Sequence, residues 1–254
     1  MKTSTLLDNK WIRAALALAV WLLVWEGLAR WVNITLLLPG PVIVVQTLAE
    51  LLGSADFRTA TGFSLLGVLT GFLIGVAAGS LLAWLTWASR LADALFSPLL
   101  RLVRTAPVAS FIILALIWLT SRTVPMVIAA LMVAPILWSS TKTAIEETDP
   151  ALLEMAKAYR FPAWQRFRLV YLPQILPQWT AACATAMGLA WKSGIAAEVI
   201  AQPRPAIGTN LYRARLFLNT EELFAWTVLI ILLSFLLERL FIRSMAGLGR
   251  RYAA

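Results

Sequence analysis

The chain contains no histidine and a single cysteine, Cys183, among its 254 residues. Histidine is the commonest metal ligand and general base in proteins, so its absence disfavours a metalloenzyme or a histidine-dependent hydrolase. One cysteine cannot form a disulfide within the chain and gives no information on the redox compartment. We therefore predict no catalytic residue and no metal site, and we expect that the chain is not an enzyme.

Charged residues are also scarce. They make up 14% of the chain, whereas soluble domains average about 25%, and hydrophobic residues make up 60%. This composition predicts an all-α membrane protein with no separate soluble domain. The sequence GxxxxGKS or GxxxxGKT, which holds the phosphates of ATP in many ATPases, is absent. The chain is therefore not expected to bind ATP in that manner.

Apolar runs long enough to cross a bilayer recur along the chain, since a transmembrane helix needs about 20 such residues. They predict a single transmembrane domain over residues 1–254 with six spans, at about 14–31, 60–87, 98–120, 124–141, 175–200 and 224–241. A cleaved signal peptide is the alternative for the first run, but the tryptophans that border it favour a membrane helix. Pro39 and Pro41 end any helix, so the eleven residues that follow are expected to form a short helix at the membrane surface.

Four glycines recur at every fourth position of the second predicted span: Gly67, Gly71, Gly75 and Gly79. This spacing puts them on one face of a helix, where small residues let two helix backbones approach closely in lipid. Close packing inside a helix bundle is the favoured interpretation, and a dimerisation seam is the alternative.

The distribution of Lys and Arg predicts the orientation, because cytoplasmic connections carry an excess of both. Fifteen of these residues fall on one set of span ends and six on the other, with Lys192 inside a span. Both termini and the polar loop at 144–174 are therefore predicted to be cytoplasmic. The formal net charge of +9 is then a topology signal, and no nucleic-acid partner is needed to explain it.

The polar loop is expected to form two helices separated by a turn. Asp149 and Pro150 suit the N-cap and first position of a helix, and strong helix formers follow them. Pro162 pushes Phe161 out of the helical region and can itself open a second helix. Pro173 marks the entry to the fifth span.

The loop resembles the motif of ABC-importer permeases, in which Glu-Ala-Ala is followed by three residues, Gly, nine residues and Ile-x-Leu-Pro. Glu154, Ala156, Leu172 and Pro173 match this motif by identity and in spacing, and Met155 and Val170 are mild replacements. Arg160 departs from it, because the family usually has glycine there. Since arginine adopts a left-handed turn only at a cost, we expect the turn to depend on Phe161 and Pro162 instead.

The resemblance covers most of the chain, from about Leu36 to Arg243. The segments LLPGPVIVVQTLAELL, SPLLRLVRTAPVASFIILALIWL, AAEVIA and LFLNTEELFAWTVLIILLSFLLERLF are similar to permeases of the nitrate, sulfonate and taurine importer family. This resemblance implies a multi-pass protein of the bacterial cytoplasmic (inner) membrane that imports a small solute, expected to be anionic. It also implies a homodimer, or a heterodimer with a similar chain.

The same resemblance implies the partners. Two cytoplasmic ATP-binding subunits would bind ATP and Mg²⁺, while this chain binds no cofactor. A periplasmic or lipid-anchored binding protein would deliver the solute. The loop helix would dock on the ATPase, with Glu154 contacting a basic group, and the predicted ATPase-coupling residues are Glu154, Met155, Ala156, Lys157, Ala158, Tyr159, Arg160 and Phe161.

Two charged residues, Lys192 and Glu198, lie in the otherwise apolar fifth span and are candidates for the translocation path. They are six residues apart, about 240° around a helix, so a direct pair is not expected. Snorkelling of Lys192 to the headgroups, or an ion pair with another span, is the alternative. For the whole chain the rival functions are an ion-gradient-driven secondary transporter and a membrane scaffold that transports nothing.

Overall fold

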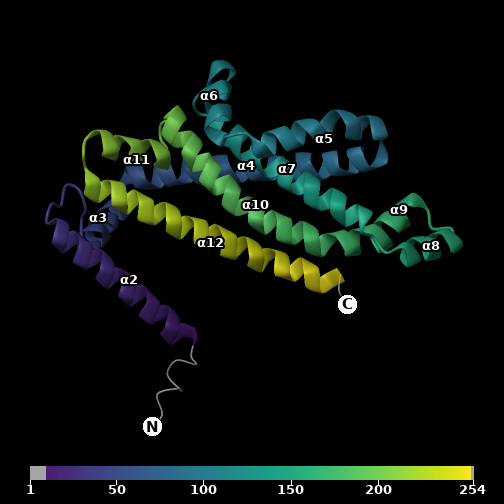
Figure 1. Ribbon diagram of the computed structural model, residues 1–254, viewed down its shortest axis with the longest axis horizontal. Helices are drawn as coiled ribbons and strands as arrows, with labels where there is room; N and C mark the ends of the chain where they lie inside the picture. Colours follow the sequence, from purple (N-terminus) through teal and green to yellow (C-terminus); the bar gives the residue numbers. More distant parts are fainter. Residues whose placement is uncertain (1–9, 253–254) are drawn as a thin grey trace, which may run out of the picture. The chain divides into compact units, whose positions relative to one another are not determined.

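The protein is described from a computed structural model over residues 10–252, and this part of the chain is all-helical (Figure 1). In chain order the helices are α2 (Lys10–Val32), α3 (Pro41–Gly53), α4 (Ala55–Ala88), α5 (Arg90–Thr105), α6 (Val108–Trp118), α7 (Val124–Glu146), α8 (Pro150–Ala158), α9 (Ala163–Arg166), the π-helix η1 (Phe167–Tyr171), α10 (Leu172–Ala201), α11 (Ile207–Leu216) and α12 (Thr220–Tyr252). The predicted cytoplasmic placement of the two chain ends concerns residues 1–9 and 253–254, which lie outside the described residues.

The helices form two compact units. Among the described residues, the first comprises 10–58 and 210–230, and the second comprises 59–209 and 231–252. In the first unit, the Trp25 indole donates a hydrogen bond to the Pro39 carbonyl oxygen (3.1 Å) and packs against the Phe224 ring. Phe57 stacks on Trp226 in the same unit, with ring centroids 5.7 Å apart.

Four described helices are long and apolar enough to cross a membrane, in the ranges Ile12–Val32, Ala55–Ala88, Val124–Glu146 and Thr220–Met245. The number is five if α5 and α6 together count as one broken span. The predicted fifth span corresponds to α10, which has 30 residues but is not in this apolar set. Much of α10 is buried against protein, so it can carry polar side chains that a lipid-facing helix would exclude.

The predicted span at 98–120 is two helices, because the chain breaks between Thr105 and Val108. The axes of α5 and α6 are bent by 111° at this break. Pro107 is the cause: it has no N–H to continue α5, and it restricts the preceding Ala106 to an extended conformation (φ −77°, ψ 148°). The chain therefore turns sharply inside the range that was predicted to be one span.

Three of the four spaced glycines of α4 face α7. A Cβ atom added to Gly71, Gly75 or Gly79 would lie within 3.0 Å of a backbone carbonyl oxygen of α7, whereas nothing lies within 4 Å of one added to Gly67. Close packing inside the helix bundle is thus confirmed for these three positions. The helix α7 also packs lengthwise on α10, and the two helices run together through the second unit (Figure 1).

Candidate functional site

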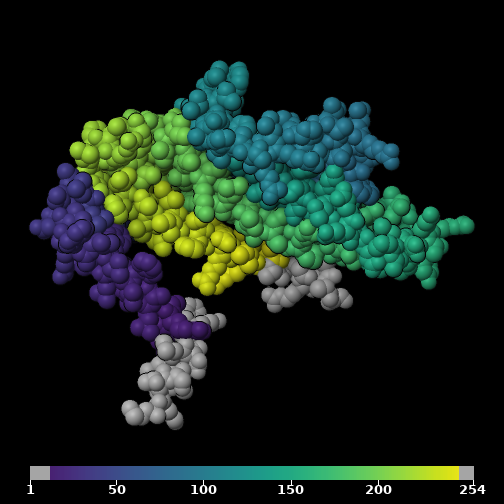
Figure 2. All heavy atoms as spheres, viewed as in Figure 1, coloured from purple at the N-terminus to yellow at the C-terminus, as the bar shows by residue number. Residues whose placement is uncertain are grey.

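The predicted coupling loop forms a short helix, a turn and a second helix beyond the ends of α7 and α10 (Figure 1), and its atoms protrude at the right of the view in Figure 2. Asp149 is the N-cap of α8, and its carboxylate accepts a hydrogen bond from the Ala151 N–H (2.8 Å). Pro150 occupies the first helical position. These two residues explain why the helix begins here, because both suit a helix N-terminus.

Most of the predicted coupling residues are exposed on α8. Ala156, in contrast, is buried (1% exposed). Phe161 is half-buried, and the side chains open to a partner are those of Glu154, Met155, Lys157, Ala158, Tyr159 and Arg160. Met155 and Tyr159 are large apolar side chains, 39% and 74% exposed. An acidic group beside exposed apolar side chains is a surface suited to docking a protein.

The turn after α8 is formed by Arg160 itself, so the expectation that it depends on Phe161 and Pro162 is wrong. Arg160 has φ 55°, in the left-handed region. The Arg160 N–H donates to the Lys157 carbonyl oxygen (3.1 Å), and the Phe161 N–H donates to the Ala156 carbonyl oxygen (2.9 Å). This pair of bonds is a Schellman motif, in which glycine is the preferred left-handed residue. The bonds compensate for the conformation that arginine otherwise disfavours.

Replacing Arg160 by glycine is therefore expected to stabilise the protein by about 1 kcal/mol, because glycine adopts positive φ without steric cost. The thermal midpoint of the purified protein in detergent measures this change. Lys157→Gly is the matched control: it puts glycine inside α8 and should destabilise by about 1 kcal/mol. A midpoint for Arg160→Gly at or below that of the natural chain would contradict the argument.

Aromatic contacts hold the second half of the loop against the end of α4. The Trp84 ring lies 5.3 Å from Phe167 and 5.6 Å from Tyr171, measured between centroids, and Trp87 also lies 5.6 Å from Tyr171. Phe167 and Tyr171 are the two ends of the π-helix η1, through which α9 runs into α10. The loop is thus joined to α7 and α10 through the chain and to α4 through these rings.

The two path candidates of α10 lie in different surroundings, and they are not paired. Lys192 is exposed. Glu198 is 1% exposed, and its Oε2 accepts hydrogen bonds from the Ser64 hydroxyl of α4 (2.9 Å) and the Gly208 N–H of α11 (2.9 Å). The Ser64 hydroxyl oxygen also accepts from the Ile207 N–H (3.0 Å). Glu198 therefore holds the N-terminus of α11 against α4 and α10.

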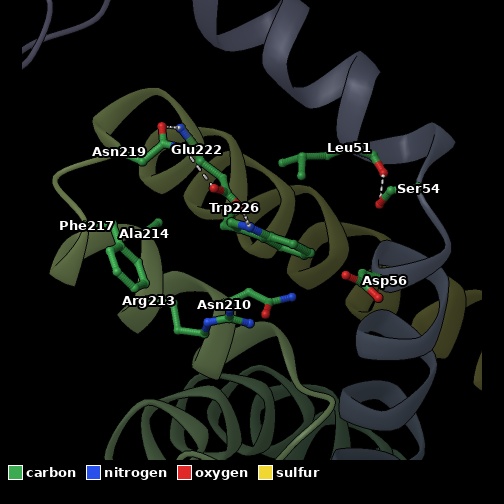
Figure 3. A pocket seen from close by; sticks show the side chains of 10 residues that line it. All are labelled: Leu51, Ser54, Asp56, Asn210, Arg213, Ala214, Phe217, Asn219, Glu222 and Trp226. Carbon is green, nitrogen blue, oxygen red and sulfur yellow. Dashed lines mark hydrogen bonds between the residues drawn. The ribbon is translucent and has the colours of Figure 1, made fainter.

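The first unit contains a pocket of about 370 Å³ with mixed polar and aromatic walls (Figure 3). Its lining residues are Leu51, Ser54, Asp56, Asn210, Arg213, Ala214, Phe217, Asn219, Glu222 and Trp226. The Glu222 carboxylate accepts hydrogen bonds from the Trp226 indole (3.2 Å) and the Asn219 amide (2.9 Å), which fixes this wall. Arg213 is exposed and presents a cation at the pocket.

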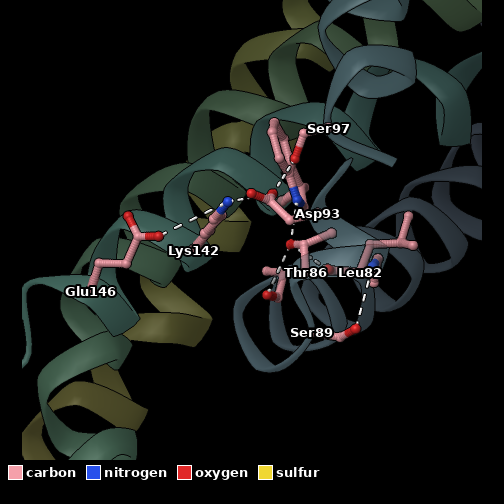
Figure 4. A network of polar contacts seen from close by, with 10 residues as sticks. Leu82, Thr86, Ser89, Asp93, Ser97, Lys142 and Glu146 are labelled. Carbon is pink, nitrogen blue, oxygen red and sulfur yellow. Dashed lines mark hydrogen bonds and ion pairs between the residues drawn. The ribbon is translucent and has the colours of Figure 1, made fainter. Parts of the chain in front are cut away.

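A polar network at the other unit joins α4, α5 and α7, and sequence reasoning missed it (Figure 4). Lys142 of α7 forms an ion pair with Asp93 of α5, with Nζ 2.5 Å from Oδ1. In the sequence Lys142 is one of the fifteen cations at the predicted cytoplasmic span ends, and it is not among the predicted site residues. Its place after a long apolar run, like that of Lys192, is the signal that would have singled it out.

Comparison with known proteins gives a consistent set of relatives. The family model described as "Binding-protein-dependent transport system inner membrane component" matches residues 71–253. A protein of Bacillus subtilis (strain 168) named as an aliphatic sulfonates transport permease is 27% identical over 223 residues, covering 86% of this chain and 80% of the relative. The taurine transport system permease protein of Escherichia coli (strain K12) is 27% identical over 239 residues, covering 87% of this chain and 82% of the relative.

Solved structures of transporters resemble the fold. A chain from the crystal structure of an amino acid ABC transporter superposes with TM-score 0.61 at 17% identity, covering 77% of this chain and 93% of that chain. A chain of the methionine ABC transporter MetNI in an inward-facing conformation superposes with TM-score 0.58 at 19% identity. The superposition covers 81% of this chain and 95% of that chain. At these identities the likeness concerns the fold alone.

Proposed function

The chain belongs to the family of binding-protein-dependent transport system inner membrane components, and from this membership we propose that it is the permease of an importer for a small anionic solute. The relatives named for aliphatic sulfonates and taurine favour a sulfonate of this kind. The match over residues 71–253 carries the proposal, because this range includes α7, the coupling loop and α10. An extracytoplasmic binding protein delivers the solute.

The projecting helix α8 is the proposed contact with the ATP-binding subunits. Two such subunits bind ATP and Mg²⁺, and each receives one α8 from a pair of permease copies. Glu154 meets a basic group on the ATPase, while Met155 and Tyr159 fill an apolar groove beside it. Movement of α8 on ATP binding reaches α7 and α10 through the short loop, because α8 begins only a few residues after α7 ends.

The proposed topology has six spans, with both termini and α8 in the cytoplasm. The fifth span is α10, whose length of 30 residues, about 45 Å, exceeds the thickness of a bilayer core. In this topology the pocket of the first unit opens outside the cell, where its Arg213 and Glu222 dock the binding protein. Lys192, exposed on α10, is the proposed cation of the solute path.

Co-purification with co-expressed ATP-binding subunits tests the proposal, followed by ATP hydrolysis with and without the binding protein. Glu154→Ala is expected to reduce the stimulated rate about tenfold, because a charged contact at the docking surface is lost. Glu147→Ala is the control, since Glu147 is also an exposed glutamate but lies before α8. If the binding protein still stimulates ATP hydrolysis fully in Glu154→Ala, the proposed role of Glu154 is contradicted.

Two rival functions predict different results. A secondary transporter would import solute in vesicles that contain this chain alone under a pH gradient. A scaffold would bind neither the ATP-binding subunits nor a binding protein. Import without ATP, or no association with an ATPase, would overturn the permease proposal.

A further inference from the structure

Lys142 is the single cation of α7, and it is largely enclosed. Its side chain is 18% exposed, and its ammonium lies 2.5 Å from Asp93 Oδ1 and 4.0 Å from Glu146 Oε1. It also lies 5.8 Å from the centroid of the Trp138 ring one turn earlier in the same helix. In Figure 4 the Lys142 side chain reaches across from α7 to α5, and Glu146 lies beside it, one turn further along α7.

The partner side chains are themselves held in place. The Ser97 hydroxyl, one turn along α5, donates a hydrogen bond to Asp93. The Lys142 ammonium donates to the same carboxylate, so two side chains hold the Asp93 carboxylate in place. Trp138 donates its indole N–H to the Thr86 hydroxyl of α4 (2.9 Å), and both residues are buried. A continuous set of contacts therefore joins α4, α7 and the start of α5.

The ion pair between Lys142 and Asp93 lies between two parts of the chain that a transporter must move together. On one side, Lys142 stands eight residues before Pro150, the first residue of α8. On the other side, α5 leads through the break at Pro107 into α6, which packs with the far end of α7 and the end of α10. A buried apolar cluster holds α6 against these two helix ends. It consists of Val103, Ile112, Val124, Ile128, Met132, Ala197 and Ala201.

We propose that Lys142 is a positioning residue for transport, whose ion pair with Asp93 makes the broken helix α5–α6 follow the end of α7 that carries α8. A partly enclosed pair with a second carboxylate and an aromatic ring around its cation resists separation better than a solvated surface pair. When α8 moves, α5 moves with α7 instead of sliding past it. This inference rests on the proposed function, in which α8 docks on the ATPase.

A merely structural role for Lys142 would change assembly but not the ratio of transport to ATP hydrolysis. The experiment therefore uses the assembled complex in vesicles with its binding protein, and measures radiolabelled taurine or ethanesulfonate imported per ATP hydrolysed. Lys142→Met removes the charge and keeps the length of the side chain, and it is expected to lower this ratio about tenfold. Lys142→Arg keeps the charge and should restore most of the ratio.

Two further variants make the test specific to the pair. Asp93→Asn should lower the ratio as Lys142→Met does, and the double variant should be no worse than either alone, because both remove one interaction. Arg104→Met is the matched control: Arg104 is an exposed cation of α5, and its loss should leave the ratio unchanged. If Lys142→Met does not assemble, Asp93→Asn decides the question.

The outcomes separate this inference from the proposed function. If the natural chain binds no ATPase, the proposed function fails and the inference fails with it. If the natural complex imports solute but Lys142→Met and Asp93→Asn keep the natural ratio, only the inference is overturned. Additive losses in the double variant would also overturn it, because they would show that the two residues act separately.

Discussion

Replacing Gly75 by leucine is expected to prevent the protein from folding into its helix bundle. Even the first added carbon atom would lie 2.7 Å from the Ala130 carbonyl oxygen and 2.7 Å from the Val133 Cβ atom. A carbonyl oxygen of a helix backbone cannot move aside as the end of a flexible side chain can. The helices α4 and α7 would have to separate, at an expected cost of about 4 kcal/mol or more.

The matched control lies two turns away on the same helix. Gly67→Leu makes the same change of residue, but nothing lies within 4 Å of an added Cβ atom there. Size-exclusion chromatography and intrinsic tryptophan fluorescence during heating, both in detergent, measure the two variants side by side. We expect Gly67→Leu to elute and melt like the natural chain and Gly75→Leu to aggregate. Equal behaviour of the two variants would show that α4 does not approach α7 in this way.

These glycines illustrate what could and could not be predicted from the sequence. The spacing of four residues is a local property of one helix, so it was enough to predict a closely packed face. The partner of that face is α7, more than 50 residues further along the chain, and no pattern within α4 identifies it. Nor could the spacing separate Gly67 from the other three, because that difference depends on where α7 lies.

The turn at Arg160 shows a different limit. The position of the turn was predictable, because Asp149, Pro150 and Pro162 mark the helix ends chemically. That Arg160 itself adopts the left-handed conformation was not predictable. This conformation is costly for arginine, so the turn was expected to depend on Phe161 and Pro162 instead. The two Schellman hydrogen bonds, from Arg160 and Phe161 to carbonyl groups of α8, outweigh that preference. The break at Pro107 is similar: proline predicts an interruption, but the angle of 111° depends on where α6 packs.

Charged residues in the spans were the least predictable part of the site. Sequence position identified Lys192 and Glu198 alike as charges within an apolar helix, yet one is exposed and the other buried. The hydrogen-bond donors to the Glu198 carboxylate are Ser64, which is 134 residues away in the sequence, and Gly208, which is 10 residues away. Gly208 is needed for this approach, because an added Cβ atom would lie 2.5 Å from the Glu198 Cβ atom.

Removing the Glu198 carboxylate is expected to destabilise the protein strongly. In Glu198→Ala the buried Gly208 N–H loses its acceptor, the Ser64 hydroxyl loses the group to which it donates, and a cavity is left between α4, α10 and α11. Each buried polar group without a partner costs about 1–3 kcal/mol, so we expect a loss of about 3 kcal/mol or more. The thermal midpoint in detergent, followed by tryptophan fluorescence, should fall accordingly.

Two variants decide whether the hydrogen bonds cause this loss. Glu198→Gln keeps an oxygen that can accept from both Ser64 and Gly208, so it should stay within about 1 kcal/mol of the natural chain. Lys192→Met removes an exposed charge from the same helix and should leave the midpoint almost unchanged. If Glu198→Gln is as unstable as Glu198→Ala, the carboxylate matters for a reason other than these two bonds. If neither changes the midpoint, Glu198 does not hold α11 in place.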